Sequence, residues 1–420
     1  MIEYLNIESF KSFRSAKVQF GPLTILVGAN ASGKSNLRDA LRFLHGVGLG
    51  YSLAEIIGEK YGPGGILQWR GIRGGAVEAA FWGEKRFSIE VGVKPPSVVV
   101  PFHYHLTIDL SDEKLGPRVV AEGLRLWGVQ LFDSAPKDDP VQQRGEHQIR
   151  IRQPRGGKYR AHGKISEFSS ARPVLTQFPD RKGESALLKR RCEMVSDALA
   201  SMRFLDLEPD AMRRPAQPGQ VVLGDKGENL SSVLQAICAD SNSEASLLEW
   251  VHALTPMDAS SFEFKKDYSG KILVHLVEED GRSISAHSAS DGTLRFLAMV
   301  AALQSHDTGR LYFFEEIDNG IHPARLHLLL RLLGEASETQ GIQVIATTHN
   351  PALLSYLDAD TRADAHIVYR PQGASDSRVK RLGDLPTLES VVAKHDLGGL
   401  LTSSWLEDAA YFNEPDGGEE

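Results

Sequence analysis

Cysteine is scarce in this chain of 420 residues, which contains only Cys192 and Cys238. Two widely separated cysteines are too few for a disulfide scaffold and lack the spacing of zinc ligands. Long apolar runs are also missing, because no uncharged stretch approaches the roughly 20 residues that cross a bilayer. The first eight residues have no basic start followed by an apolar core, as a signal peptide would. These absences predict a cytoplasmic protein without a membrane partner.

An excess of positive charge is absent as well. The chain has 47 Lys and Arg residues against 55 Asp and Glu residues, so its net charge is -8. This balance excludes a generally basic coat for nucleic acid, although it allows a local basic groove. The content of 41% hydrophobic and 24% charged residues is ordinary for a globular protein, and the length allows two or three domains.

Residues 28–35 fit the phosphate-binding loop G-x-x-x-x-G-K-[ST] without a gap. They are Gly28, Ala29, Asn30, Ala31, Ser32, Gly33, Lys34 and Ser35. An apolar, β-rich run at 23–27 precedes the loop, and apolar residues at helical spacing follow it at 36–44, which is the context that the motif needs. Lys34 is expected to reach the β- and γ-phosphates, and the Ser35 hydroxyl to bind Mg²⁺. An ordinary Gly/Ser turn is disfavoured because the motif and its context coincide.

The rest of the chain predicts a split arrangement. Strands are expected at 85–93, 98–110 and 118–128 as an antiparallel meander, a helix at 184–203, and α/β alternation after residue 290. The predicted divisions are 1–80, the first part of the nucleotide-binding core; 81–180, an antiparallel β lobe; 181–285, a helical insertion with return strands; 286–375, the second part of the core; and 376–420, C-terminal helices with an acidic tail.

Two later strands end in residues that suit a nucleotide site. The apolar run 311–314 ends in Glu315 and Glu316, of which the first could bind Mg²⁺ and the second could activate water. The run 344–348 is followed by His349, and ligands bind at the carboxyl ends of strands in open α/β sheets. Upstream, Ser290 and Gly292 open a helix and could form an anion site, although an ordinary capped helix would look the same.

This chain resembles the ABC-type ATPase core in four segments, which are in order 28–35, 290–295, 313–316 and His349. More closely, it resembles the RecF/SMC/OLD-related group of "AAA family" ATPases of bacterial repair and phage-defence operons, of which the opening residues 7–13 are typical. The resemblance implies an α/β fold, a P-loop NTPase of the ABC-ATPase type with a mixed sheet flanked by helices. It also implies ATP and Mg²⁺ as cofactors, with Ser35 and Glu315 as the metal ligands.

The resemblance implies a homodimer, or a higher oligomer, that closes around ATP. Ser290 and Gly292 of one subunit would contact the γ-phosphate held by the other subunit. Glu316 would be the general base and His349 the switch histidine, with Lys34 completing the catalytic set. Asn36 follows the loop as it does in this group and is counted with the nucleotide-binding residues.

Some assignments depend on weaker similarity. Asp318 and Asn319 would lie at the dimer seam, and the glutamine that links the two lobes is expected at Gln177, with Gln68 as the second candidate. Departures from the family pattern are Asp291 and Thr293 in the signature, Ala31 in the loop, and Glu315 where Asp is usual. The longer Glu315 side chain predicts weaker Mg²⁺ placement and slow turnover.

Basic residues gather between 147 and 164, namely Arg150, Arg152, Arg155, Lys158, Arg160 and Lys164, and Tyr159 lies among them. This segment is either a grip for nucleic-acid phosphates or a solvated hairpin tip. OLD-type relatives carry a nuclease module after the core, and the residues after 369 are too few for one. A separate effector protein, a nuclease or a toxin, is therefore expected in phage defence, and DNA repair is the alternative. A transporter subunit, a clamp that barely hydrolyses ATP, and a small-molecule kinase fit less well.

Overall fold

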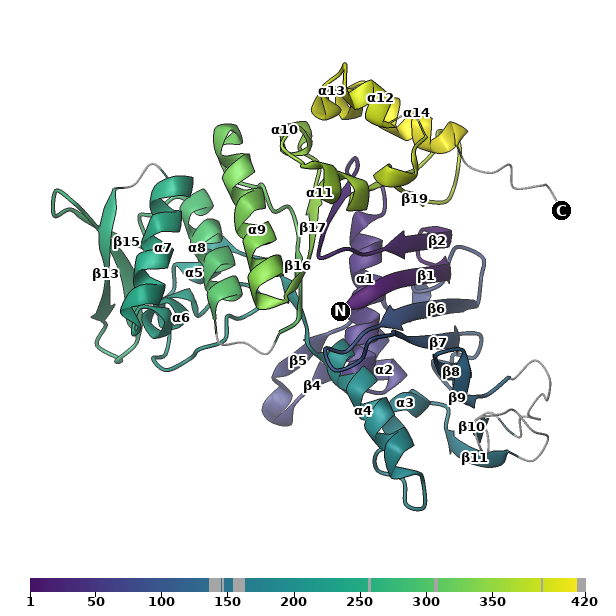
Figure 1. Cartoon of the computed structure of the whole chain (residues 1–420). Coiled ribbons are helices and arrows are strands. Elements are labelled where there is room, and N and C mark those ends of the chain that lie inside the picture. Colours follow the sequence, from purple (N-terminus) through teal and green to yellow (C-terminus); the bar gives the residue numbers. More distant parts are fainter. Residues whose placement is uncertain are drawn as a thin grey trace.

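The computed structural model of this chain describes residues 1–135, 145, 147–153, 163–255, 258–305, 309–386 and 388–413. Figure 1 shows an antiparallel sheet on the right, a group of helices on the left and a central sheet between them. The C-terminal helices lie at the top of this view. The central sheet carries the predicted nucleotide site.

The central sheet has six strands, of which five run parallel and the last pairs antiparallel at one edge. In spatial order they are β12 (Met202–Leu205), β16 (Leu311–Phe314), β17 (Gln343–Thr348), β3 (Leu23–Val27), β18 (His366–Tyr369) and β19 (Arg378–Arg381). β3 and β17 are neighbours, and Thr348 pairs with Val27. The two distant parts of the predicted core therefore fold into one sheet, which confirms the P-loop type of α/β fold.

Every residue of β3 and β17 is buried, because apolar cores cover both faces of the central sheet. Successive side chains of a strand point to opposite faces, so Ile25 belongs to one core and Leu26 to the other. This burial on both faces explains why these strands read as continuous apolar runs.

The antiparallel sheet has eight strands. In spatial order they are β11 (Lys164–Ser169), β10 (Gln148–Gln153), β9 (Val129–Asp133), β8 (Arg118–Leu126), β7 (Phe102–Asp109), β6 (Arg86–Val93), β1 (Ile2–Phe10) and β2 (Phe13–Gln19). The predicted meander is present, although its second strand begins at Phe102 rather than at residue 98. β1 and β2 also belong to this sheet, so it extends across the division predicted at residue 80, and the division stays a prediction.

Helix α1 (Lys34–Gly48) follows the phosphate loop and packs against α4 (Ala186–Ala200). A Cβ on Gly48 would lie 2.4 Å from the Ala200 nitrogen, so only glycine allows this close approach. Smaller elements of this part are α2 (Leu53–Ile57), β4 (Glu59–Tyr61), η1 (Pro63–Gly65), β5 (Leu67–Arg70), η2 (Gly75–Val77) and α3 (Val174–Gln177).

The helix predicted over 184–203 is too long, because α4 ends at Ala200 and residues 202–205 form β12. A short apolar run cannot be assigned to helix or strand by periodicity alone. β12 pairs in parallel with β16, where Phe204 lies opposite Phe313. The carboxyl end of β12 therefore reaches the same edge of the sheet as the predicted acids.

Helices α1 and α4 belong to the core on one face of the central sheet, and a second, mainly helical group of elements packs against the opposite face (Figure 1). Its elements are α5 (Pro209–Met212), α6 (Leu230–Ile237), α7 (Ser241–Leu254), β13 (Ala259–Lys266), β14 (Ile272–Glu278), β15 (Ser283–Ser285), α8 (Asp291–Gln304), η3 (Pro323–Arg325) and α9 (Leu326–Gln340). Helix α8 is apolar on almost every side because α5, α6 and α7 surround it.

Short helices complete the chain after β17. They are α10 (Pro351–Leu354), α11 (Ala359–Asp364), η4 (Leu382–Asp384), α12 (Leu388–Val392), α13 (Leu397–Thr402) and α14 (Trp405–Phe412). The acidic tail after residue 413 lies outside the described residues. Within the described part of the chain, no helix combines the length and apolar character needed to cross a membrane.

Candidate functional site

The phosphate loop joins β3 to α1 and requires glycine at both of its ends. Gly28 has φ +156°, and a Cβ there would lie 2.0 Å from the Val368 carbonyl oxygen of β18. Gly33 has φ +121° directly before α1. Ala31 has φ +63°, a left-handed conformation that glycine adopts more easily.

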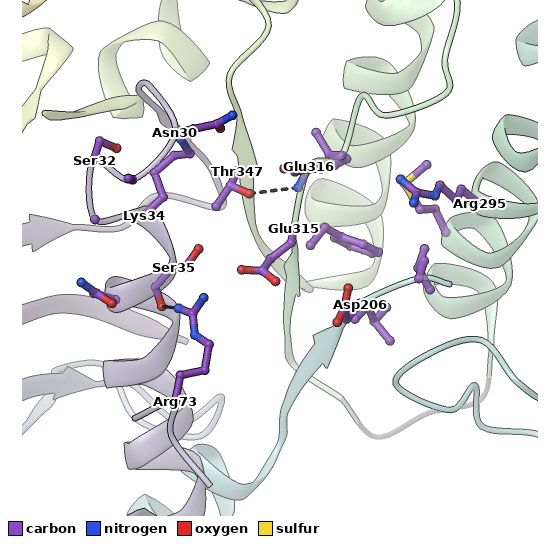
Figure 2. A pocket seen from close by; sticks show the side chains of 18 residues that line it. Asn30, Ser32, Lys34, Ser35, Arg73, Asp206, Arg295, Glu315, Glu316 and Thr347 are labelled. Atoms are coloured by element: carbon purple, nitrogen blue, oxygen red, sulfur yellow. Dashed lines mark hydrogen bonds between the residues drawn. The ribbon is translucent and has the colours of Figure 1, made fainter. Parts of the chain in front are cut away.

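Lys34 is the first residue of α1, and its side chain folds back over the loop (Figure 2). Its ammonium group donates hydrogen bonds to the carbonyl oxygens of Gly28 at 2.5 Å and Ala29 at 2.9 Å. Burial lowers the pKa of Lys34, and the nearby Glu316 carboxylate raises it in part. A half-buried cation held mainly by neutral carbonyl groups is a strong attractor for a bound phosphate.

A cavity of about 640 Å³ opens in front of the loop (Figure 2). Later parts of the chain also line it, namely the segment before η2, the end of β12, helix α8, the end of β16 and the end of β17. The lining residues used below are Asn30, Ala31, Ser32, Gly33, Lys34, Ser35, Asn36, Arg73, Asp206, Arg295, Glu315, Glu316 and Thr347. The fold therefore brings the loop and both predicted acids to one cavity.

Glu315 and Glu316 follow directly after β16, and their side chains point in different directions. In Figure 2, the Glu315 carboxylate points toward Ser35. Glu316 has φ +47°, an uncommon conformation for a residue other than glycine. Its backbone N–H donates to the Thr347 hydroxyl at 3.0 Å, and the Asn319 amide donates to its carboxylate at 3.2 Å. These bonds hold an exposed acid in a strained position at the mouth of the cavity.

The residues on the two sides of this cavity fit a hydrated magnesium ion. Mg²⁺ prefers oxygen ligands and usually takes one or two carboxylates together with phosphate oxygens. The Ser35 hydroxyl and the Glu315 carboxylate are such donors and lie across the cavity from each other (Figure 2). The buried Ser32 hydroxyl has no hydrogen-bond partner among the described residues, which leaves a polar group of the loop available for a phosphate.

The signature residues lie outside this cavity. Ser290 is exposed at the start of α8, where its hydroxyl accepts the Thr293 N–H at 3.1 Å as the N-cap. A Cβ on Gly292 would lie 1.9 Å from the Gly320 carbonyl oxygen, so this glycine allows α8 to pack against the loop after β16. Asp291 forms an ion pair with Arg213 at 2.6 Å.

His349 is exposed just beyond the end of β17 and does not line the cavity. The preceding threonines take part instead. Thr347 holds the Glu316 backbone, and the Thr348 hydroxyl donates to Asp318 at 2.7 Å. Asp318 is buried, so in a single chain it supports the loop after β16, while the neighbouring Asn319 is exposed.

The prediction that Gln177 links the lobes at the nucleotide is wrong in this structure. Its amide donates to the carbonyl oxygens of Ser169 and Arg172, and it faces a different hollow near β10 and β11. These bonds close the short helix α3 onto the antiparallel sheet. Gln68, the second candidate, lines a hollow that adjoins the phosphate-loop cavity. The distance of Gln177 from the loop could not be derived from the sequence.

Three charged residues that sequence reasoning did not assign line the cavity, namely Arg73, Asp206 and Arg295. Arg73 could have been suspected, because it lies in a Gly-rich stretch that also contains Arg70. Its guanidinium forms an ion pair with the buried Asp39 of α1 at 3.1 Å. Asp206 follows the unrecognised strand β12 and carries no local signal. Arg295 is the last residue of the 290–295 segment, but no role was predicted for it.

The described part of the predicted basic segment is largely neutralised. Arg150 pairs with Glu167 at 3.2 Å, Lys164 pairs with Glu184 at 2.8 Å, and Arg152 is buried. The remaining predicted residues, Arg155, Lys158, Tyr159 and Arg160, lie outside the described residues. Arg213, outside this segment, forms ion pairs with Asp210 and with Asp291 of the signature.

The chain is similar to known ATPases and ATPase folds over most of its length. A relative from Helicobacter pylori (strain ATCC 700392 / 26695), named "ATP/GTP phosphatase", is 21% identical over 363 residues, which cover 85% of this chain and 88% of the relative. The solved SMC head bound to the C-terminal winged-helix domain of ScpA matches with a TM-score of 0.50 and 14% identity over 90% of this chain and 96% of that one. The SMC head domain from Thermotoga maritima matches with a TM-score of 0.41 and 15% identity over 90% of this chain and 98% of that one.

The sequence profile of one family spans both halves of the cavity. It matches residues 23–355, from β3 through the phosphate loop, the signature and the acids to α10. This range covers well over half of the chain. The chain shares the fold of the solved SMC head, and it belongs to the AAA_21 family, described as "AAA domain, putative AbiEii toxin, Type IV TA system", as an ATPase of the AAA type.

Proposed function

We propose that this protein binds ATP with Mg²⁺, dimerises around it, and releases its partner on hydrolysis. One observation carries the proposal, which is that Lys34, Ser35, Glu315 and Glu316 line the same cavity although they come from opposite ends of the chain. A phosphate loop alone would support only anion binding. The two acids facing it add what metal binding and hydrolysis require.

The loop residues would hold the triphosphate. The backbone N–H groups of 28–35 and the start of α1 favour negative charge, and Lys34 would turn from the Gly28 and Ala29 carbonyls to the β- and γ-phosphates. Ser35 and Glu315 would hold Mg²⁺, which neutralises phosphate charge when bound. Asn36 would support the loop, because its amide already donates to the Ser12 hydroxyl at 2.7 Å.

Glu316 would orient and deprotonate the attacking water. Its strained backbone and its bonds to Thr347 and Asn319 fix its direction in the nucleotide-free chain, so less reorganisation is needed for catalysis. His349 would contact the γ-phosphate only if the end of β17 or the partner subunit moved it toward the cavity. We therefore assign it the lesser role of a switch.

The signature would act on the ATP of a second subunit. Ser290 is exposed and lies outside the cavity of its own chain, as a group that binds in trans requires. Binding energy from two shared ATP molecules would then be converted into association of the subunits. Gly292 would contribute indirectly, by letting α8 approach the loop that follows the catalytic acids.

For the biological role, we propose a sensor or scaffold switch for a separate effector protein in phage defence, with DNA repair as the alternative. The similarity to the RecF/SMC group and the family description support both. The ion pairs of Arg150 and Lys164 reduce the support for nucleic-acid binding through the 150–164 segment. Identifying proteins that co-purify with the ATP-trapped form would separate the two roles, since a nuclease or toxin favours defence and a recombination protein favours repair.

ATP turnover of Glu316→Gln, measured beside the wild type, tests the proposed reaction. The amide keeps the size of the side chain but cannot accept the proton, so we expect turnover to fall about 100-fold or more while ATP binding persists. Glu335→Gln on the exposed face of α9 is the matched control and should turn over at the wild-type rate. Equal rates for the wild type and Glu316→Gln would contradict the assignment of Glu316 and favour a clamp that only binds ATP.

A further inference from the structure

Arg38 faces the first acid from helix α1. It lies one turn after Ser35, and its Nε atom is 3.7 Å from the Glu315 carboxylate. The side chains of Arg38 and Glu315 are only 12% and 22% exposed. The guanidinium also lies over the Phe204 ring of β12, 5.9 Å from its centre. Three elements of the core, α1, β12 and β16, therefore hold this ion pair.

Arg38 belongs to a second hollow of about 810 Å³ that adjoins the phosphate-loop cavity. Arg73, Asp206 and Glu315 line both spaces, so they form the wall between them. Glu315 thus has the loop and Ser35 on one side and Arg38 on the other. The buried Arg38 Nε has no hydrogen bond within the described residues. Arg38 forms an ion pair with Glu315, and its charge also acts on Asp225, which lines the same hollow.

We propose that Arg38 is a positioning residue that holds Glu315 in the nucleotide-free chain and so sets the Mg²⁺ concentration needed for tight ATP binding. The inference rests on the proposed function, in which Glu315 helps to hold Mg²⁺. A carboxylate shared between a guanidinium and Mg²⁺ binds each of them less well than it would bind either alone.

The direction of the effect follows from this competition. When Arg38 is removed, Mg²⁺ no longer competes with a fixed cation, and the Glu315 charge is left uncompensated. The half-saturating Mg²⁺ concentration should therefore decrease. The pair is partly exposed, and such pairs contribute modestly, so we expect a decrease of about threefold.

The experiment measures binding of a fluorescent, non-hydrolysable ATP analogue to the full chain over a range of Mg²⁺ concentrations. The variants are Arg38→Gln, Glu315→Gln and the double variant, which together form a double-mutant cycle, because each single variant removes one charge of the pair. Arg38→Gln should lower the half-saturating Mg²⁺ concentration about threefold in the wild-type background and have no effect in the Glu315→Gln background. A merely structural role of Arg38 would give the same change in both backgrounds.

Lys226→Gln is the matched control. Lys226 also lines the second hollow, but its ammonium pairs with Glu208 rather than Glu315, so the Mg²⁺ dependence should not change. If Arg38→Gln fails to fold, Arg38→Lys keeps the charge while losing the guanidinium and should give a smaller decrease. An unchanged or increased Mg²⁺ requirement in the Arg38 variant would overturn this inference alone. Absence of analogue binding by the wild type at every Mg²⁺ concentration would overturn the proposed function as well.

Discussion

The two helix starts that carry the nucleotide motifs differ in how complete they are within one chain. At the start of α1, Gly33 offers no capping side chain, and the surrounding cavity contains the acids of β16. At the start of α8, Ser290 caps the helix with its own hydroxyl and is exposed to solvent. An uncapped helix start inside a polar cavity suits a ligand of its own chain. The capped and exposed helix start has no cavity of its own chain in front of it, so under the proposed function it acts on the nucleotide of a partner subunit.

This difference has a consequence for substitutions. Changes at α1 should act on ATP binding by a single chain, whereas changes at the exposed surface of α8 should act on association. Gly292 lies at the start of α8 but packs inside its own chain, so it tests where the boundary between the two regions lies.

The largest effect is expected for Lys34→Ala, which removes the cation from the loop. Loss of a half-buried, charge-assisted contact to phosphate should weaken ATP binding about 100-fold. Isothermal titration with an ATP analogue would measure the change. Lys17→Ala, an exposed lysine on β2, serves as the control and should bind normally. Wild-type affinity in Lys34→Ala would show that the cavity does not bind ATP through the loop.

The next effect separates the two helix starts. Ser290→Arg should leave ATP binding by a single chain nearly unchanged but prevent ATP-driven association, because the bulky cation occupies the exposed surface at the start of α8. Size-exclusion chromatography with light scattering, in the presence of a non-hydrolysable ATP analogue, would measure association.

Ser290→Arg also removes a helix cap, which contributes about 1 kcal/mol. Asp358→Ala removes the comparable cap of α11 and controls for this loss, since Asp358 accepts the Thr361 N–H at 2.7 Å. Association should survive in Asp358→Ala. If Ser290→Arg still associates normally with ATP, the assignment of Ser290 to the partner's nucleotide is wrong.

The smallest effect is expected for Gly292→Ala, which should lower the free energy of unfolding of the chain even when no nucleotide is present. The new methyl group would meet the Gly320 carbonyl oxygen, so α8 or the loop after β16 must move, at a cost of about 1–3 kcal/mol. Thermal unfolding would detect the loss. Gly334→Ala in α9 is the control, because its methyl group would meet nothing within 4 Å and alanine favours a helix. Unchanged stability in Gly292→Ala would mean that this glycine serves the partner and not its own chain.

The pattern of residues within a short segment was sufficient to predict those elements whose signal lies in consecutive residues. The loop 28–35, the strands at both ends of the core and the acids Glu315 and Glu316 could all be predicted, because each depends on backbone conformation or burial that its own residues specify. The capping role of Ser290 belongs to the same class. Each of these signals spans no more than about two turns or one strand.

Only the tertiary structure decided which distant groups share the cavity. Arg73, Asp206 and Arg295 reach it from the segment before η2, the end of β12 and the second turn of α8, and no spacing in the chain encodes that convergence. Gln177 is the glutamine expected between the two lobes, yet its hydrogen bonds keep it on the antiparallel sheet. The physical reason is that strand order and packing between sheets depend on long-range burial, which a local pattern of residues does not contain.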